Sequence, residues 1–312
     1  MLKPIFKGLI SYLPGMSSFF SKRNPGSSST SNYCYGVFLK HITILWENGL
    51  KKIPNTMVEL GPGGSFGIGI AAMLSGVNNY YALDVVPVSR TENNLEMLKE
   101  LAELLKKCDP RPRKGWPDFD LYLNDSLFPD DILQPDLLAA TLTEERIDLI
   151  LSAIKDSGAG TGSIRMEYIV PWQDKGSLEN ESADLILSHS VMEHVEDIDK
   201  AYSAMYEWLK PGGFISHQID FRSHGTAYEW NGYWTYSDIM WRIMNGKLPY
   251  LINRQSCSAH IDVLLKRGFE IVYLKKRYEN HGIKRAELDS RWHAISDDDL
   301  KCSGLFIQAK KR

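Results

Sequence analysis

Short apolar runs alternate along this chain with longer stretches whose apolar residues recur at helical spacing. The helical spacing covers residues 33–50, 68–74, 91–107, 198–209 and 259–267. The apolar runs, each predicted to be a strand, are residues 56–60, 80–84, 164–170, 183–188, 214–220, 269–274 and 304–309. Strands that alternate with helices predict an α/β fold with a mostly parallel sheet covered on both faces.

Three segments interrupt this pattern. Residues 21–32 (SKRNPGSSSTSN) are rich in Ser, Gly and Pro, which predicts a linker between an N-terminal segment (1–32) and one domain (33–312). Residues 109–163 and 221–258 are longer than ordinary connections and are predicted to be insertions. Before the linker, the mildly apolar residues 5–13 predict a short helix packed on the domain, with interfacial membrane contact or a partner site as the alternatives.

Composition narrows the classes of function only slightly. The 312 residues have a formal net charge of −3, which provides no basic field for nucleic acid or an anionic membrane. The four cysteines are scattered without metal-ligand spacing, so we expect reduced thiols and a cytoplasmic protein. No apolar run reaches the roughly 18 residues that a membrane span needs.

A glycine-rich turn, Gly61-Pro62-Gly63-Gly64, directly follows the first predicted strand and precedes a helix. Such a turn places backbone N–H groups where a ligand can approach closely. Phe66 stands at the sixth position, where a dinucleotide fingerprint needs glycine. Glu59, two residues before the turn, would repel a pyrophosphate but suits a ligand with ammonium and sulfonium groups.

Asp84 ends the second predicted strand, 25 residues after Glu59. A carboxylate in this place can accept hydrogen bonds from both hydroxyls of a ribose. Either acid alone is as readily explained as a solvated residue at a strand end. The two acids in this order favour a nucleoside site.

Two further blocks follow in the sequence, Ala183-Asp184-Leu185-Ile186-Leu187-Ser188-His189-Ser190-Val191-Met192-Glu193-His194-Val195 and Leu209-Lys210-Pro211-Gly212-Gly213-Phe214-Ile215. Together with Glu59-Leu60-Gly61-Pro62-Gly63-Gly64 and Asp84, they resemble the class I S-adenosylmethionine-dependent methyltransferases over residues 33–309. The resemblance implies a Rossmann-like sheet of seven strands whose last strand is antiparallel, and S-adenosyl-L-methionine as the methyl donor.

The resemblance also implies roles for single residues. Gly61 and Gly63 would admit the methionine part of the donor, with Glu59 beside them, and Asp84 would hold the ribose. Tyr168, near the end of the third strand, would border the adenine. His189 and Ser190 would line the methionyl side. Relatives that methylate quinone precursors bind a metal through an acid three residues before a Glu-His pair; Ser190 stands there, so we expect no metal.

The acceptor side is predicted from chemistry alone. An alcohol acceptor must lose its proton, and the base should lie at the carboxyl ends of the fourth and fifth strands. His217, Asp220 and His224 follow one another there, so we expect one histidine to act as base and Asp220 to orient it, with purely structural roles as the alternative for each. The aromatic stretch 226–254 is either an acceptor pocket or a hydrophobic cap.

The sequence therefore predicts a methyltransferase that acts on oxygen of a small molecule, such as a sugar, a nucleotide-sugar or a related metabolite. A methyltransferase for protein or nucleic acid is the second hypothesis, although no basic stripe accompanies the site. A non-catalytic S-adenosylmethionine-binding module, or an aminopropyl transferase of the same fold, is the third.

Overall fold

The computed structural model describes residues 3–16, 30–112, 119–125, 127–156, 163–172, 175–248 and 251–312. Its strands are β1 (Thr56–Leu60), β2 (Asn79–Leu83), β3 (Arg165–Ile169), β4 (Ala183–His189), β5 (Leu209–Asp220), β6 (Phe269–Tyr278) and β7 (Cys302–Lys311). Its helices are α1 (Lys3–Ile10), α3 (Ser31–Glu47), α4 (Gly67–Leu74), α5 (Thr91–Lys106), α6 (Phe119–Tyr122), α7 (Pro135–Thr141), α8 (Glu144–Asp156), α9 (Ile198–Trp208), α10 (Asp238–Asn245), α11 (Cys257–Lys266) and α12 (Asp297–Lys301).

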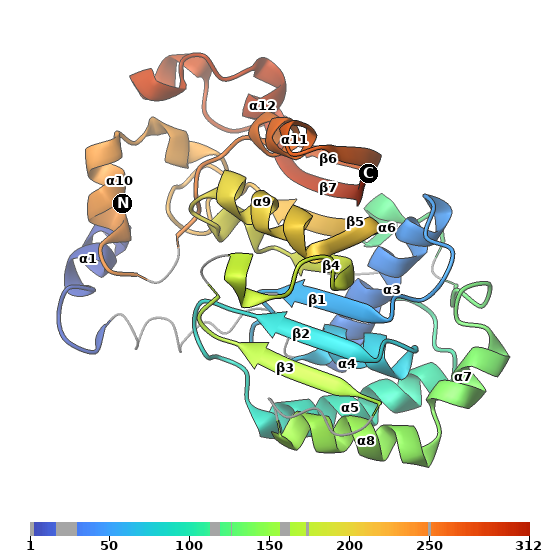
Figure 1. The fold of residues 1–312 in the computed structure, drawn as a ribbon. Coiled ribbons are helices and arrows are strands. Elements are labelled where there is room, and N and C mark those ends of the chain that lie inside the picture. The colour runs from blue at the N-terminus through green and yellow to red at the C-terminus, as the bar shows by residue number, and fades with distance from the viewer. Residues whose placement is uncertain are drawn as a thin grey trace.

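The strands form one sheet in the order β3-β2-β1-β4-β5-β7-β6 (Figure 1). Strand β7 runs antiparallel to both of its neighbours, β5 and β6, whereas the other pairs are parallel. The predicted fold class is therefore confirmed. The chain crosses from one side of the sheet to the other between β1 and β4, and ligands of open α/β sheets bind at the carboxyl ends of the strands at such a switch point.

Each face of the sheet has its own hydrophobic core. Helices α3, α4, α5 and α8 bury their apolar residues on one face, together with the side chains of Met57 and Tyr80. Helices α9 and α11 cover the other face, where Val58 and Leu60 point. Successive residues of a strand point to opposite faces, so the apolar runs of the central strands fill both cores.

The glycine-rich stop after α9 lies inside β5 rather than before it. Ala183 pairs with Leu209, but Leu185 pairs with Phe214, so the residues between Leu209 and Phe214 form an irregularity within the strand. Gly212 has a φ of 79°, which residues with a side chain rarely adopt. These glycine-containing residues therefore shape the start of the strand.

The N-terminal helix packs on the domain, as predicted. Helix α1 crosses α10 at Gly8, where an added Cβ would lie 2.1 Å from the carbonyl oxygen of Ile243. The hydroxyl of Ser11 also accepts a hydrogen bond from the backbone N–H of Lys247 at 2.7 Å. Residues 21–29 of the predicted linker lie outside the described residues, and Thr30 caps the start of α3.

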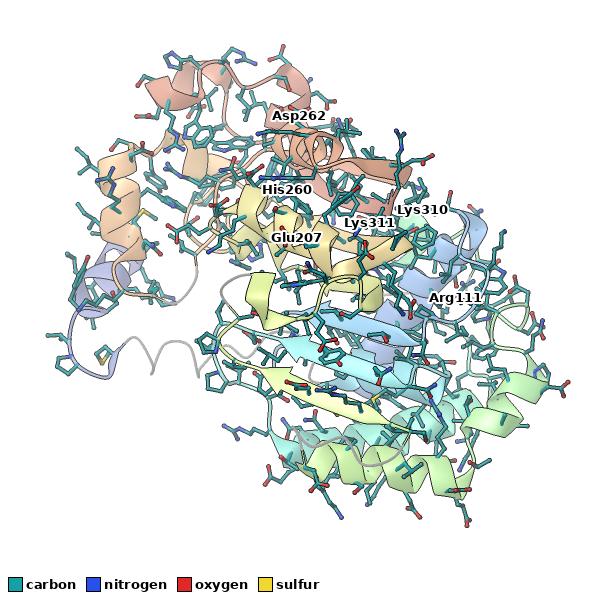
Figure 2. The ribbon with its side chains drawn as sticks, in the orientation of Figure 1. Arg111, Glu207, His260, Asp262, Lys310 and Lys311 are labelled. Atoms are coloured by element: carbon teal, nitrogen blue, oxygen red, sulfur yellow. The ribbon has the colours of Figure 1, made fainter. Side chains whose placement is uncertain are left out.

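Helix α8 of the 109–163 insertion packs beside α4, α5 and β3, whereas α6 packs against α3, with Tyr122 on Phe306 of β7. Arg146 of α8 donates hydrogen bonds to the carbonyl oxygens of Met73 and Val77, next to the start of β2. Closer to α3, Arg111 donates to the hydroxyl of Thr43 at 3.0 Å (Figure 2). These anchors hold the insertion against α4, α5 and β3 and against α3.

The described part of the aromatic stretch after β5 forms a hydrophobic cap, which we define as residues 226–248 and 251–254 together with 283–300. Tyr233 and Trp234 are each 1% exposed and pack against apolar side chains of the second segment. The indole N–H of Trp234 donates to the carbonyl oxygen of Arg254 at 3.0 Å. The buried rings therefore stabilise the cap, and Figure 1 shows α10 on the side toward which β1, β2 and β3 point.

Gly69 allows α4 to lie directly on the ring of Tyr80, because a Cβ at this position would be 2.1 Å from the ring carbon Cζ. We expect Gly69→Ala to destabilise the protein by about 1–3 kcal/mol, although alanine favours a helix more than glycine does. Denaturant unfolding measures the change. In a Tyr80→Ala background the same substitution should be neutral or stabilising, and an equal loss in both backgrounds would show that the ring contact is not the cause.

Candidate active site

The glycine turn after β1 adopts the backbone conformation that glycine favours. Gly61 and Gly63 have φ values of 63° and 71°. A Cβ on Gly61 would lie 2.6 Å from a methyl carbon of Val191, which follows β4. The turn therefore lies at the switch point between β1 and β4, and a side chain at position 61 would collide with the neighbouring connection.

Glu59 lies beneath this turn, 2% exposed, on the face of the sheet that α4 covers. Its carboxylate accepts a hydrogen bond from the hydroxyl of Tyr80 at 2.6 Å and another from the backbone N–H of Gly69. Burial raises the pKa of Glu59 to about 7, and the nearby carboxylate of Asp84 adds to that rise. Glu59 therefore titrates close to neutral pH.

Asp84 joins the end of β2 to the glycine turn. Its carboxylate accepts hydrogen bonds from the backbone N–H groups of Val85 at 2.7 Å and Val86 at 3.3 Å, and also from Gly63. Burial raises its pKa, and these amide groups offset part of the rise. Since Glu59 pairs with Ala82, two residues before Asp84, the two acids lie on the same face of the sheet.

Tyr168 of β3 contacts the loop that follows Asp84. Its hydroxyl donates to the carbonyl oxygen of Val86 and accepts from the N–H of Val88, both at 3.2 Å. Its ring packs edge-on against Phe66, with the centroids 4.9 Å apart. These contacts place Tyr168 beside the region of Asp84, where it holds the loop in position.

His189, at the end of β4, faces α3. Its Nδ1 lies 3.2 Å from Nε2 of His41, whose Nδ1 lies 2.7 Å from the hydroxyl of Ser216. Burial lowers the pKa of both histidines well below the usual value. Ser190 follows with a φ of 56° and donates its backbone N–H to the carbonyl oxygen of Gln218, which turns the chain sharply beside the glycine turn.

The structure brings together only two of the three residues expected to act on the acceptor. His217 is fully buried, and its Nδ1 lies 2.7 Å from the hydroxyl of Ser188, next to Tyr202 of α9. Burial lowers the pKa of His217 to about 3. Asp220 stands three positions after His217, an odd offset, so their side chains point to opposite faces of β5 and His217 stays apart from the other two.

Asp220 and His224 lie together at the carboxyl end of β5. Nε2 of His224 is 3.6 Å from Oδ2 of Asp220 and 4.0 Å from Oε1 of Glu193. Arg222 binds both carboxylate oxygens of Asp220 through its Nε and a terminal nitrogen, at 2.8 Å each, which lowers the pKa of Asp220 against the effect of burial. Sequence reasoning missed Glu193, although it belongs to the Glu-His pair after the fourth strand.

The comparisons with known proteins agree with this arrangement. A family model described as a methyltransferase domain matches residues 147–216, which include β3, β4, the turn with Glu193 and α9. The match extends into β5, and the glycine turn and Asp84 lie before it. Residues 147–216 therefore belong to a methyltransferase domain, and the chain is an S-adenosylmethionine-dependent methyltransferase. The family that the motifs indicated is therefore confirmed, and so are the methyl donor and the enzymatic class.

Solved structures similar to this methyltransferase share little sequence with it. An S-adenosylmethionine-dependent methyltransferase from Mesorhizobium loti is 14% identical, with a TM-score of 0.42, over 87% of this chain and 97% of that one. A putative sarcosine dimethylglycine methyltransferase from Galdieria sulphuraria is 14% identical, with a TM-score of 0.45, over 88% and 85%. Phosphoethanolamine N-methyltransferase 2 from Haemonchus contortus, in complex with S-adenosyl-L-methionine, is 15% identical, with a TM-score of 0.44, over 95% and 60%. No curated protein matches the sequence.

Two observations show that the residues of this methyltransferase suit the donor. The left-handed glycines leave the backbone of the turn without side chains, and a buried acid lies on each of the two strands beside it. S-adenosylmethionine supplies a methyl group on a positively charged sulfur.

In the part of the chain that the structure describes, no helix has the length and apolarity to cross a membrane.

Asp84→Asn tests the proposed ribose contact. The amide can still accept from Val85 and Val86, so the loop should keep its shape, whereas the charge-assisted bonds to the ribose are lost. We expect S-adenosylhomocysteine to bind about 10- to 100-fold more weakly in calorimetry, as the loss of such bonds implies. Asp131→Asn, at an exposed acid far from the turn, is the matched control; equal affinities in all three proteins would remove Asp84 from the ribose site.

Glu59 should make donor binding depend on pH near 7. Below this pH its carboxyl is protonated; above it the carboxylate attracts the sulfonium and ammonium groups, so affinity should rise with pH. We expect a gain of at least roughly fivefold, equivalent to about 1 kcal/mol. Calorimetry between pH 5.5 and 7.5 measures it.

Glu59→Gln provides the control for this pH dependence. The ligand's own amino group titrates equally with both proteins, so the difference between their profiles isolates the carboxyl group. The variant should bind the donor with an affinity that follows only the ligand's titration. Parallel profiles for the two proteins would mean that Glu59 does not interact with the donor's charge.

Proposed function

We propose that this methyltransferase transfers the methyl group to a hydroxyl oxygen of a small polar molecule, such as a sugar, a nucleotide-sugar or a related metabolite. The observation that supports the proposal is the group formed by Glu193, Asp220 and His224 at the carboxyl ends of β4 and β5. We call this group the acceptor cluster. It lies on the edge of the sheet where the glycine turn would present the methyl group.

The proposal follows from the chemistry of methyl transfer. The acceptor hydroxyl gives up its proton, its oxygen bonds to the methyl carbon, and the electron pair of the broken carbon–sulfur bond remains on sulfur. A neutral hydroxyl is a weak nucleophile, so removal of the proton must accompany the attack. Holding the two reactants in line supplies much of the remaining acceleration.

The acceptor cluster provides groups for the proton and for orientation. His224 is one-third exposed, so a ligand from solvent can reach its ring. Asp220 is fixed by Arg222 and lies 3.6 Å from Nε2 of His224, which suits a carboxylate that orients an imidazole. His217 has no part in this proposal, because its ring is buried on the other face of β5.

The charge of the molecule favours a small acceptor. The formal net charge is −3, and the acceptor cluster itself holds two carboxyl groups. A nucleic acid would need a basic surface to neutralise its phosphates. Hydroxyl groups of a sugar are instead suited to hydrogen bonds with carboxylates and imidazoles.

Labelled methyl transfer tests this function. The purified enzyme is incubated with ¹³C-methyl S-adenosylmethionine and the small-molecule extract of a strain that lacks its gene. We expect a single product heavier by one methyl group, with the label on oxygen in the ¹³C NMR spectrum. Label on nitrogen, or label only in the macromolecular fraction, would contradict the proposal.

His224→Ala should lower the rate of methyl transfer by about 100-fold or more while donor affinity stays unchanged, because a positioned acid or base contributes that much. His281→Ala, which removes a mostly exposed ring outside the acceptor cluster, is the matched control. Steady-state kinetics and calorimetry separate the two effects. Full turnover in His224→Ala would place the proton transfer elsewhere.

A further inference from the structure

Three side chains near the ends of β4 and β5 place possible metal-ligating atoms close together. Glu193, His194 and His224 each offer one such atom, and these atoms all lie within 4.8 Å of one another. Glu193 and His194 come from the short turn after β4, and His224 comes from the loop after β5. Two imidazoles and one carboxylate form a ligand set that transition metals bind in proteins.

Glu193 is the most deeply buried of these three possible ligands, which is unusual for a carboxyl group. Its side chain is 2% exposed, and neither carboxylate oxygen has a hydrogen-bond partner of normal geometry. The backbone N–H groups of Glu193 and Asp220 approach the carboxyl group, but without hydrogen-bond geometry. Arg222 binds both oxygens of Asp220 and acts on Glu193 through its charge. Burying a carboxylate is strongly unfavourable unless it is well paired, and a cation bound directly to it would reduce that penalty.

His194 is held in the orientation that metal-bound histidines usually have. Its ring hydrogen-bonds to the backbone of Leu251 in the cap. Histidines that bind metals commonly donate their second ring nitrogen to such a carbonyl group. The contact links the turn after β4 to the cap.

Asn253 of the cap fixes the same turn through its side chain and its backbone. Its amide group donates to the carbonyl oxygens of Met192 and Val195 at 2.8 Å each, and its backbone N–H donates to the carbonyl oxygen of Glu193. Three hydrogen bonds from one residue hold the two ends and the middle of the turn. Glu193 and His194 are therefore positioned before any ligand arrives.

His224 is the ligand whose ring would have to move for all three residues to bind one ion. It has a φ of 47°, its ring is one-third exposed, and Nε2 lies 4.0 Å from Oε1 of Glu193. Atoms bound about 2 Å from a tetrahedral ion are roughly 3.3 Å apart, so His224 must move inward by about 1 Å. Its present contact at 3.4 Å with the carbonyl oxygen of Asp220 is long and easily replaced.

We propose that Glu193, His194 and His224 bind one divalent transition-metal ion, such as Zn²⁺, Co²⁺ or Mn²⁺. Three protein ligands leave at least one position open on the ion. An acceptor held by the acceptor cluster would lie next to the ion, because Glu193 and His224 belong to both groups. In the metal-bound enzyme His224 would be a ligand rather than the base, so an acceptor hydroxyl made more acidic by the ion would lose its proton to water.

This inference rests on the proposed function only for the ion's role toward the acceptor. The expectation of no metal came from Ser190, which stands three residues before the Glu-His pair. The third ligand in this proposal comes instead from His224, in the loop after the next strand. Metal binding can therefore be measured without any acceptor or any turnover.

Cobalt titration of the full-length protein, tag-free and treated with a chelator, tests the site. We expect saturable binding of one equivalent of Co²⁺, with the intense visible absorption of a tetrahedral or five-coordinate ion, and its loss when Zn²⁺ is added. Glu193→Gln and His224→Ala should each weaken binding by about tenfold or more. His281→Ala, the matched control, should bind Co²⁺ like the wild type.

The site is excluded if the wild type shows no saturable absorption, or if His224→Ala binds Co²⁺ as tightly as the wild type. His224→Ala changes a partly exposed loop residue, so this comparison holds even if Glu193→Gln does not fold. A normal Co²⁺ spectrum without O-methyl transfer would leave the metal site standing and overturn the proposed function. O-methyl transfer by a protein that does not bind Co²⁺ would support the proposed function and exclude the metal site.

Discussion

The carboxylate of Asp84 accepts hydrogen bonds from the loop that follows it and from Gly63 of the glycine turn. Through these bonds one acid holds the end of β2 against the turn that follows β1. Glu59 lies on the same face of the sheet and interacts electrostatically with Asp84. We infer that the donor site depends on this arrangement, because a donor with its methionyl part on the turn would place its ribose beside Asp84.

Much of the fold could be predicted because its signals are local. The runs at 56–60 and 183–188 consist of residues that fill both cores, and the structure contains β1 and β4 at these positions. Glycine at 61 and 63 also follows from local geometry, since both residues have left-handed backbone conformations. The predicted start of β5, residue 214, was less accurate than the others, because β5 begins at Leu209. The irregular pairing after Leu209 depends on a neighbouring strand rather than on local sequence.

The acceptor side was harder to predict because it depends on contacts between distant segments. His217 and Asp220 are close in sequence, yet alternation along β5 separates their side chains. Glu193 was overlooked since nothing nearby in the sequence shows that His224 approaches it. From the sequence, Tyr233 and Trp234 could belong to an acceptor pocket or to a hydrophobic cap. In the structure they pack against apolar residues at 283–300, as residues of a cap do.

A crystal structure with bound S-adenosylhomocysteine tests the central claim most directly. The account predicts that the ribose hydroxyls lie within hydrogen-bond distance of Asp84 and that the methionyl part follows the backbone of Gly61 and Gly63. The sulfur should then face the acceptor cluster. Density for the nucleoside in any other place, with the turn closed by protein side chains, would contradict the account.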